Sequence, residues 1–348
     1  MAGGLGSRFW PMSQADNPKQ FIDIIGTGQS LLQSTFARME QVCPRENIII
    51  VTSVAHAAMV REQIPDLLPY QVLSEPLRRN TAPCVAYAAA VISNICPDAT
   101  VVVTPSDHAI FGSHRFVEDI NEAIDVADTH GWVTTIGVQP TNPNNKYGYI
   151  QYSEKSSLPN FLSLHPVVTF TEKPPIEVAR QFIASGEFFW NSGILVWPLQ
   201  KLMESYHRHL PALAASFFRL NENSSHEDVE AAYSTAESIS IDIGIMEKLD
   251  DVHVLEASFG WSDIETWESL YNTYPHDPSG NAVVSGNIFL YDTKDCVVHV
   301  PHHQTVVVKG LEGYIVASGG DTMLICPRAD EEQLFRFTND VELGLKNK

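Results

Sequence analysis

The sequence predicts an α/β protein with a mostly parallel sheet, followed by a small all-β domain. In the first part of the chain, short runs rich in β-branched residues alternate with segments that have the apolar spacing of a helix. From residue 281 onward, β-prone runs recur between Gly, Asp and Lys turns, with no long helix among them. The length of 348 residues accommodates one large domain and a smaller one.

The expected strands of the first domain are residues 48–52 (IIIVT), 100–104 (TVVVT) and 133–137 (VTTIG). Helical spacing covers residues 31–41, 83–93 and 116–129. Strand–helix alternation predicts parallel strands with helices on both faces, and ligands of such sheets bind beyond the carboxyl ends of the strands. The glycine-rich residues 3–6 and the residues 105–108 after TVVVT occupy positions of that kind.

The second domain is defined by five β-prone runs: NIFLY, CVVHV, TVVVK, YIVAS and TMLIC. A short helix is expected after them, at about residues 331–335. We place the boundary before residue 278, so that the two domains span residues 1–277 and 278–348.

The composition limits the partners of the chain. With 42 acidic and 22 basic residues the formal net charge is −20, and no basic stripe suited to nucleic acid or an anionic membrane is present. The five cysteines are widely spaced without a C-x-x-C pair, which argues against a disulfide framework or a zinc site. Apolar runs are too short to span a bilayer, and no secretory signal is visible. We therefore expect a cytoplasmic protein that binds neither nucleic acid nor membrane.

The most informative segment is the N-terminal MAGGLGSRFWPMSQADNPKQF. Gly3, Gly4 and Gly6 permit a tight turn with several N–H groups pointing inward, as in loops that bind phosphate. Arg8 and Lys19 add two cations suited to phosphate oxygens. The pattern fits neither G-x-x-x-x-G-K-[ST] nor G-x-G-x-x-G, and a surface turn with solvated basic residues is the alternative interpretation.

Eight motifs in a fixed order resemble those of the sugar-1-phosphate nucleotidylyltransferases. The first is G-G-x-G-x-R-x-W-P-x-S followed by P-K-Q-F, whose W-P and P-K-Q-F details are similar to the mannose-1-phosphate guanylyltransferases within that family. The others are E-P-x-x-R-N-T-A-P at 75–83, P-S-D-H at 105–108, Y-G-Y-I at 147–150, E-K-P at 172–174, W-N-S-G at 190–193, S-I-D with M-E-K at 240–248 and G-W-S-D at 260–263. Together they cover residues 1 to about 270.

The resemblance implies a Rossmann-like nucleotidyltransferase domain and a left-handed β-helix-like C-terminal module often involved in self-association, so we expect a homodimer. It also implies transfer of GMP from GTP to mannose 1-phosphate, assisted by Mg²⁺, with release of pyrophosphate. Two alternatives stay open. One is a different pair of nucleoside triphosphate and hexose 1-phosphate, and the other is a non-catalytic regulatory subunit that binds a GDP-sugar.

Four residues are the expected catalytic groups: Arg8, Lys19, Asp107 and Asp263. By resemblance, Arg8 and Lys19 hold the triphosphate and stabilise the leaving pyrophosphate, while Asp107 and Asp263 bind Mg²⁺ through hard oxygen ligands. Each aspartate taken singly also fits a turn or a helix cap. Sequence spacing alone does not establish that the two aspartates converge.

Further residues are expected to bind the two substrates. Besides the three glycines and the two cations, Glu75 and Asn80 are expected near guanine, although Asn80 also fits a helix start. The sugar phosphate is expected to contact four residues: Gly148, Glu172, Lys173 and Asn191. Without the resemblance, Glu172 and Lys173 would be interpreted as a solvated ion pair and Asn191 as a turn former before Gly193.

Three features depart from the family pattern. Lys146 replaces a glycine that commonly stands before Y-G-Y-I, and it has no explanation. Glu265 adds a charge near the expected metal, where it either tunes the site or faces solvent. In this fold a buried strand precedes the glycine loop, whereas here the loop follows Met1 directly. We therefore expect a short apolar strand upstream of Met1 in the natural protein.

Overall fold

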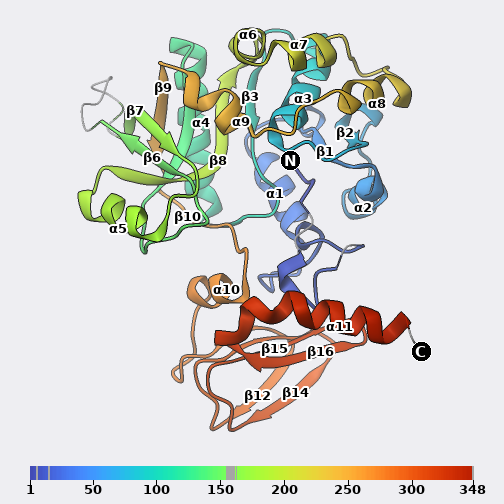
Figure 1. The fold of residues 1–348 in the computed structure, drawn as a ribbon, viewed down its shortest axis with the longest axis vertical. Helices are drawn as coiled ribbons and strands as arrows, with labels where there is room; N and C mark the ends of the chain where they lie inside the picture. The colour runs from blue at the N-terminus through green and yellow to red at the C-terminus, as the bar shows by residue number, and fades with distance from the viewer. Residues whose placement is uncertain (5–6, 15, 154–160, 162, 347–348) are drawn as a thin grey trace. The chain divides into compact units, whose positions relative to one another are not determined.

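The computed structural model describes residues 1–4, 7–14, 16–153, 161 and 163–346, and its helices and strands are shown in Figure 1. The chain divides into two compact units, and both are discontinuous in sequence. The first unit comprises Met1–Gly3, Ala37–Pro105 and Ile110–Trp261. The second unit comprises Gly4–Phe36, Ser106–Ala109 and Ser262–Lys348. The β-rich segment expected from residue 278 thus lies in the second unit, together with most of the N-terminal segment.

A six-stranded sheet forms the centre of the first unit. Its strand order is β3 (Thr100–Val103), β8 (Phe188–Pro198), β5 (Val133–Val138), β9 (Val252–Glu256), β7 (Leu164–Thr171) and β6 (Tyr149–Tyr152). Only β5 and β9 pair in parallel, and the other pairings of this sheet are antiparallel. The expectation of a mostly parallel sheet is therefore wrong.

The long strand β8 accounts for part of this error. It lies between β3 and β5 and runs antiparallel to both, so that β3 and β5 share a direction, as expected, without being neighbours. Leu195 and Trp197 of β8 belong to the core cluster that includes α3, α6 and α7, while Ile194 and Val196 are buried as well. A strand covered on both faces is a continuous apolar run without alternation, which periodicity does not distinguish from a helix segment.

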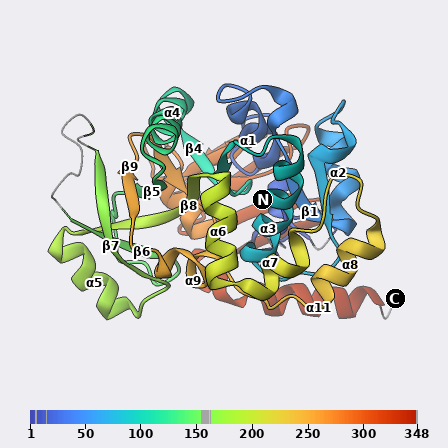
Figure 2. The same cartoon turned by 90° about the horizontal axis from the view of Figure 1, so that it is seen from above.

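Helices cover the six-stranded sheet on both sides. Seen from above, α4 (Ser113–His130) and α6 (Leu199–His209) lie on opposite sides of the strands (Figure 2), and both pack against β8. Helices α1 (Leu31–Met39), α3 (Thr81–Ile95) and α4 confirm the three helices expected from apolar spacing. The other helices that lie within the first unit are α2 (Ala57–Gln63), α5 (Ile176–Ser185), α7 (Pro211–Phe217), α8 (His226–Ser234) and α9 (Ile241–Gly244).

Four further strands form two small pairs. The parallel pair β1 (Ile50–Ser53) and β2 (Val72–Glu75) belongs to the first unit. The second pair is β4 (Ala109–Phe111) with β10 (Gly260–Ser262). Strands β1, β3 and β5 confirm the three strands expected from β-branched runs. Among the helices within the described ranges, none is both long and apolar enough to cross a membrane.

The second unit contains two small sheets that enclose an apolar core. One sheet has the order β11 (Ala282–Ser285), β13 (Val297–His299), β15 (Tyr314–Gly319) and β16 (Thr322–Pro327), and the other pairs β12 (Asn287–Tyr291) with β14 (Thr305–Lys309). All pairings except β15–β16 are parallel. Parallel pairing of successive short strands is what a β-solenoid requires, while a left-handed β-helix stays a prediction.

The five β-prone runs are confirmed as β12 to β16, but the C-terminal helix is longer than expected. Arg328–Gln333 forms a 3₁₀ turn, and α11 spans Leu334–Lys346. Asn339 and Gly344 are poor helix formers, yet both lie within α11. The unit also contains α10 (Trp267–Thr273).

The N-terminal segment packs against the sheets of the second unit. A Cβ atom at Gly319 of β15 would lie 2.5 Å from the Pro11 carbonyl oxygen and 2.7 Å from Met12 Cα. The imidazole Nε2 of His299 in β13 lies 3.1 Å from the Asp23 carbonyl oxygen. These contacts explain why residues far apart in sequence form one unit.

We expect Gly319→Ala to destabilise the protein by about 1–3 kcal/mol, because the new methyl group would collide with backbone atoms that have no alternative rotamer. Calorimetric unfolding midpoints measure this effect. Gly344→Ala is the matched control, since it lies in α11 with open space around its Cβ position and should be neutral or stabilising. Equal midpoints for the parent and Gly319→Ala would contradict the packing described here.

Candidate functional site

Lys19 is a buried cation in the second unit, in a short 3₁₀ turn over Lys19–Phe21. Only 4% of the residue is exposed. Its ammonium Nζ donates to the carbonyl oxygens of Asp263 at 2.7 Å and Ile264 at 3.2 Å, and it lies 3.2 Å from Asp107 Oδ2. The interpretation of Lys19 as a solvated surface residue is therefore wrong. The Asp107 carboxylate and the Asp263 backbone carbonyl group, which are distant in sequence, both contact this ammonium group.

The Asp107 carboxylate is held in its ionised form. Burial alone would raise its pKa, but the positive charge of Lys19, followed by that of His108, lowers the pKa from its usual value of 3.8 to about 2. One third of the side chain, 33%, is exposed, so the carboxylate is both charged and accessible. Within the described residues no cluster of three His, Cys, Asp or Glu side chains could hold a metal. Mg²⁺ commonly takes only one or two protein carboxylates together with substrate phosphates, and Asp107 offers one such carboxylate, so a magnesium site here stays a prediction.

The backbone beside Asp263 is strained. Ile264 has a φ of 38°, which is unusual for a β-branched residue. Its carbonyl oxygen accepts a hydrogen bond from Lys19, and its N–H donates to the Ser262 hydroxyl oxygen at 3.2 Å. Strained backbone of this kind persists where the surroundings fix it, often at functional sites.

Arg8 forms an ion pair with Glu265 at the surface of the second unit. The Nη1 to Oε2 distance is 2.6 Å, and the two side chains are 58% and 36% exposed. The sequence left open whether Glu265 tunes the site or faces solvent. In the structure Glu265 contacts Arg8, an expected catalytic cation. An exposed pair contributes only about 0–1 kcal/mol, so a phosphate group could displace Glu265 from Arg8.

The glycine-rich loop is held partly by the P-K-Q-F motif. Gln20, which is buried, donates from Nε2 to the Gly4 carbonyl oxygen at 2.9 Å. Gly6 lies outside the described residues. Gly3 belongs to the first unit, where a Cβ atom would lie 3.1 Å from Glu75 Oε2. A side chain at position 3 would therefore crowd the Glu75 carboxylate.

Glu75 ends β2 and is a buried carboxylate with an unusual pKa. Burial raises the pKa from 4.5 to about 7, although a hydrogen bond from the Tyr233 hydroxyl group opposes this shift. Tyr233 donates to Oε1 at 3.0 Å from helix α8. Tyr233 was missed by the sequence analysis, since no motif includes it.

Asn80 occupies the helix-capping position that its sequence allowed. It precedes α3 with a φ of 68°, and its side-chain oxygen accepts a hydrogen bond from the Thr81 N–H at 2.8 Å. The expectation of a helix start is confirmed. A contact between Asn80 and guanine stays a prediction.

The four expected sugar-phosphate residues lie together in the first unit. The Asn191 N–H donates to the Gly148 carbonyl oxygen at 2.8 Å, and a Cβ atom at Gly148 would lie 2.9 Å from Glu172 Oε2. Gly148 thus leaves open the space between an amide and a carboxylate. Lys173, with a φ of 43°, has its ammonium 3.4 Å from Glu172 Oε1 and remains 60% exposed.

Asp242 contacts an expected site residue, and we did not single it out from the sequence. The Asn191 amide nitrogen donates to Asp242 Oδ1 at 2.8 Å, while the Asn191 amide oxygen accepts from the Gly193 N–H at 3.0 Å. Burial, followed by the nearby Glu172 carboxylate, raises the pKa of Asp242 against the opposing effect of Asn191. The sequence feature that could have identified Asp242 was its position in the S-I-D motif.

An aromatic cluster connects three of the motifs in the first unit. The Tyr147 ring lies edge-on to Trp190 and Trp261, with centroid distances of 4.9 and 5.2 Å. Tyr147 belongs to Y-G-Y-I, Trp190 to W-N-S-G and Trp261 to G-W-S-D. Edge-to-face contacts of this kind stabilise a fixed arrangement of the motif loops.

Comparison with known proteins assigns the family. The family model described as "Nucleotidyl transferase" matches residues 1–279. The chain therefore belongs to the nucleotidyl transferase family, and the resemblance found in its motifs is confirmed.

Individual relatives are similar over most of the chain. The alginate biosynthesis protein AlgA of Pseudomonas aeruginosa is 31% identical over 98% of this chain and 71% of the relative. A mannose-1-phosphate guanylyltransferase of Escherichia coli K12 is 32% identical over 94% of this chain and 70% of the relative. A solved structure from Thermus thermophilus, described as a mannose-1-phosphate geranyltransferase, has a TM-score of 0.88 and 29% identity and covers 98% of both chains.

The raised pKa of Glu75 predicts a measurable pH dependence of stability. Between about pH 4.5 and 7 the folded state holds a proton that the unfolded state releases, so ionised Glu75 lowers the free energy of unfolding as pH rises through this range. Glu75→Gln cannot ionise. We therefore expect the unfolding free energy of the variant, measured with urea, to rise relative to that of the parent between roughly pH 5 and pH 8.

The exposed Glu62→Gln in α2 of the same unit is the matched control and should follow the parent. Parallel pH profiles for Glu75→Gln and the parent would show that Glu75 is not a buried carboxylate.

Proposed function

We propose that this protein transfers GMP from GTP to mannose 1-phosphate, producing GDP-mannose and pyrophosphate. The observation that carries the proposal is the buried Lys19 ammonium held against Asp107 and the Asp263 carbonyl group. The names of several relatives support the choice of substrates. The attacking oxygen of a sugar phosphate is already an anion, so the reaction needs positioning and charge neutralisation rather than a strong base.

Lys19 and Arg8 supply the positive charge that the proposed reaction requires. Lys19 is fixed by two carbonyl groups and a carboxylate, which engage its three N–H donors, so a phosphate oxygen would replace one of these acceptors. Arg8 exchanges Glu265 for a phosphate group, and its planar guanidinium group suits two phosphate oxygens at once. In a chain with a net charge of −20, such fixed cations also attract the anionic substrates locally.

Asp107 and Asp263 are the residues that would hold Mg²⁺. When bound, the ion supplies a divalent charge that reduces the repulsion between the two phosphate groups. Asp107 suits this role because its carboxylate stays ionised at any physiological pH. Lys19 orients the same carboxylate.

Glu75 is proposed to recognise the guanine base. A carboxylate accepts hydrogen bonds from guanine N1–H and from the 2-amino group, neither of which adenine offers in the same arrangement. Tyr233 orients the Glu75 carboxylate from α8, and Gly3 leaves its other oxygen uncrowded. Selectivity for guanine should therefore depend on both the charge and the orientation of Glu75.

The sugar phosphate is proposed to bind beside Gly148. Glu172, Asp242 and Asn191 offer acceptors for sugar hydroxyl groups, and Lys173 offers a cation for the phosphate. The hydrogen bonds of Asn191 to Asp242 and Gly193 fix its amide in one orientation. A fixed amide and two carboxylates can distinguish hexoses by the directions of their hydroxyl groups.

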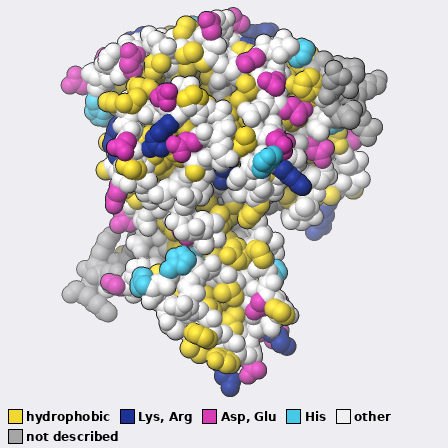
Figure 3. Space-filling view, turned by 180° about the vertical axis from the view of Figure 1, so that it is seen from behind, with side chains coloured by type: hydrophobic (Ala, Val, Ile, Leu, Met, Phe, Trp, Pro, Cys, Tyr) yellow, Lys and Arg dark blue, Asp and Glu magenta, His cyan; other side chains and the backbone are white. Residues whose placement is uncertain are grey.

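A homodimer stays our prediction, and the second unit has a surface suited to it. Figure 3 shows hydrophobic side chains on the β-rich part of the chain, in the lower part of the view. Phe289 and Tyr291 of β12 are 52% and 55% exposed, and Val307, the register partner of Phe289 on β14, is 65% exposed. Aligned apolar residues on one outer sheet face are typical of an interaction surface.

Pyrophosphate release from GTP and mannose 1-phosphate with Mg²⁺ tests the proposed function. We expect this pair to react faster than pairs containing UTP, dTTP or glucose 1-phosphate. Asp107→Asn should reduce turnover by about a hundredfold or more, because charge stabilisation in the transition state is lost. Asp321→Asn, an exposed turn residue of the same unit, is the matched control and should stay within about twofold of the parent.

Faster reaction with another substrate pair would instead support the first alternative. A folded protein that binds GDP-mannose but releases no pyrophosphate would support the regulatory subunit and refute the proposed transfer.

A further inference from the structure

Residues 263–266 of the second unit connect strand β10 to helix α10 and contact both cations of the candidate site. The first two carbonyl groups of this segment accept hydrogen bonds from Lys19, and the Glu265 carboxylate forms an ion pair with Arg8. The segment also contains the strained backbone of Ile264, which persists only where its surroundings fix it. The elements that hold the start of α10 therefore also determine where the two proposed phosphate-binding cations are held.

The first turn of α10 needs acceptors for its N–H groups, because a helix provides none for them itself. Thr266 and Ser269 form a capping box, in which each side chain accepts from the backbone N–H of the other residue. The two N–H groups between them, those of Trp267 and Glu268, donate to the two carboxylate oxygens of Glu331. The Glu268 nitrogen lies 3.0 Å from Oε2. Glu331 thus completes the hydrogen bonding of the helix start.

Glu331 suits this position by its charge as well as by its geometry. It is half-buried and lies in the 3₁₀ turn between β16 and α11, which contacts α10 (Figure 1). The start of a helix carries a partial positive charge, and hydrogen bonds to an ionised acceptor are stronger than those to a neutral one. The β-rich part of the chain therefore supplies the carboxylate that holds α10.

Arg328, in the same 3₁₀ turn, holds α10 from the side. Its Nη2 lies 2.7 and 2.9 Å from the two carboxylate oxygens of Glu268, and its Nη1 donates to the Asp295 carbonyl oxygen at 2.8 Å. The guanidinium carbon lies 3.3 Å from the centroid of the Tyr271 ring, which belongs to α10. These contacts fix the turn that carries Glu331 against the helix.

Helix α10 also packs against the segment that carries Arg8. Trp267 is fully buried, and its ring lies edge-on to Phe9 with a centroid distance of 5.1 Å. The Trp267 indole Nε1 donates to the Trp10 carbonyl oxygen at 3.4 Å. Phe9 follows Arg8 directly in the sequence. The start of α10 is thus in contact with the neighbours of both proposed cations.

We propose that Glu331 is a positioning residue for the proposed transfer, which fixes the start of α10 and thereby holds residues 263–266 against Lys19 and Arg8. Its catalytic consequence rests on the proposed function, whereas the positioning is a property of the fold. Lys19 and Arg8 are proposed to stabilise the charge that develops as pyrophosphate leaves. Loss of the Glu331 carboxylate should therefore lower kcat more than it raises KM.

Substitutions at Glu331 and at its exposed neighbour Glu332 test this proposal. Glu331→Ala removes both acceptor oxygens, Glu331→Gln keeps one of them, and Glu332→Ala is the matched control. Amide hydrogen exchange at Trp267 reports the contact with Glu331, and exchange at Ile264 reports the segment that contacts Lys19. Steady-state release of pyrophosphate from GTP and mannose 1-phosphate gives kcat and both KM values.

We expect Glu331→Ala to speed exchange at Trp267 and at Ile264 by about tenfold or more. The same variant should lower kcat by about tenfold, with each KM within about twofold of the parent. Glu331→Gln should lie between Glu331→Ala and the parent in both measurements, and Glu332→Ala should follow the parent. If Glu331→Ala does not fold, Glu331→Gln provides the same comparison.

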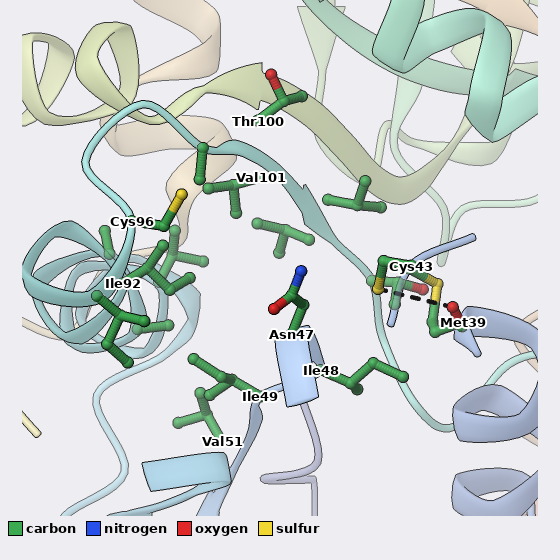
Figure 4. A pocket seen from close by; sticks show the side chains of 18 of the residues that line it. Met39, Cys43, Asn47, Ile48, Ile49, Val51, Ile92, Cys96, Thr100 and Val101 are labelled. Carbon is green, nitrogen blue, oxygen red and sulfur yellow. Dashed lines mark hydrogen bonds between the residues drawn. The ribbon is translucent and has the colours of Figure 1, made fainter. Parts of the chain in front are cut away.

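A variant of the first unit distinguishes positioning from a general loss of stability. Ile92 of α3 borders an apolar cavity of about 270 Å³, together with residues of β1 and β3 (Figure 4). Ile92→Ala should lower the thermal unfolding midpoint, because it removes apolar contacts and enlarges this cavity. It should leave kcat and the exchange at Ile264 as they are in the parent.

Three results would overturn the proposal. The first is parent-like exchange at Ile264 in Glu331→Ala, and the second is a parent-like kcat in that variant. The third is an equal change at Ile264 in Glu331→Ala and Ile92→Ala, which would show a loss of stability alone. A parent that releases no pyrophosphate would instead refute the proposed transfer, and exchange at Ile264 would still show whether Glu331 positions the segment.

Discussion

The buried ammonium group of Lys19 is the interaction on which the candidate site depends. It contacts the Asp107 carboxylate and the carbonyl oxygens of Asp263 and Ile264. An unpaired charge at a residue with 4% exposure would be costly, so these groups must converge for the second unit to fold as described. The convergence in turn keeps Asp107 ionised, which is the property that binding of a divalent cation requires. One buried cation therefore connects folding with the proposed chemistry.

The carboxylates of Asp107 and Glu75 differ in pKa because their surroundings differ. Asp107 has a cation as its neighbour and a lowered pKa, whereas burial beside the Tyr233 hydroxyl group raises the pKa of Glu75 to about 7. The same residue class thus serves two proposed roles, one as a permanently charged ligand and the other as a hydrogen-bond acceptor whose charge is sensitive to pH. Glu265, at the surface, has a different environment and forms an ion pair with Arg8.

Much of the fold and site was predictable from the sequence, for identifiable reasons. Strands with β-branched runs and helices with clear apolar spacing were found, as were residues within motifs, including Lys19, Asp107 and the group around Gly148. Strand β8 was missed because burial on both faces removes alternation, and this omission hid the antiparallel neighbour that lies between β3 and β5. Tyr233 and the Arg8–Glu265 pair were missed because they are long-range contacts, which no local pattern encodes.

The most direct test of this account is the pKa of Asp107, measured by carbon NMR in the parent and in Lys19→Met. The account predicts a value of about 2 in the parent. It predicts a clearly higher value in the variant, because burial would then act without the opposing positive charge. An Asp107 pKa that is the same in both proteins would contradict the claim that Lys19 organises the site.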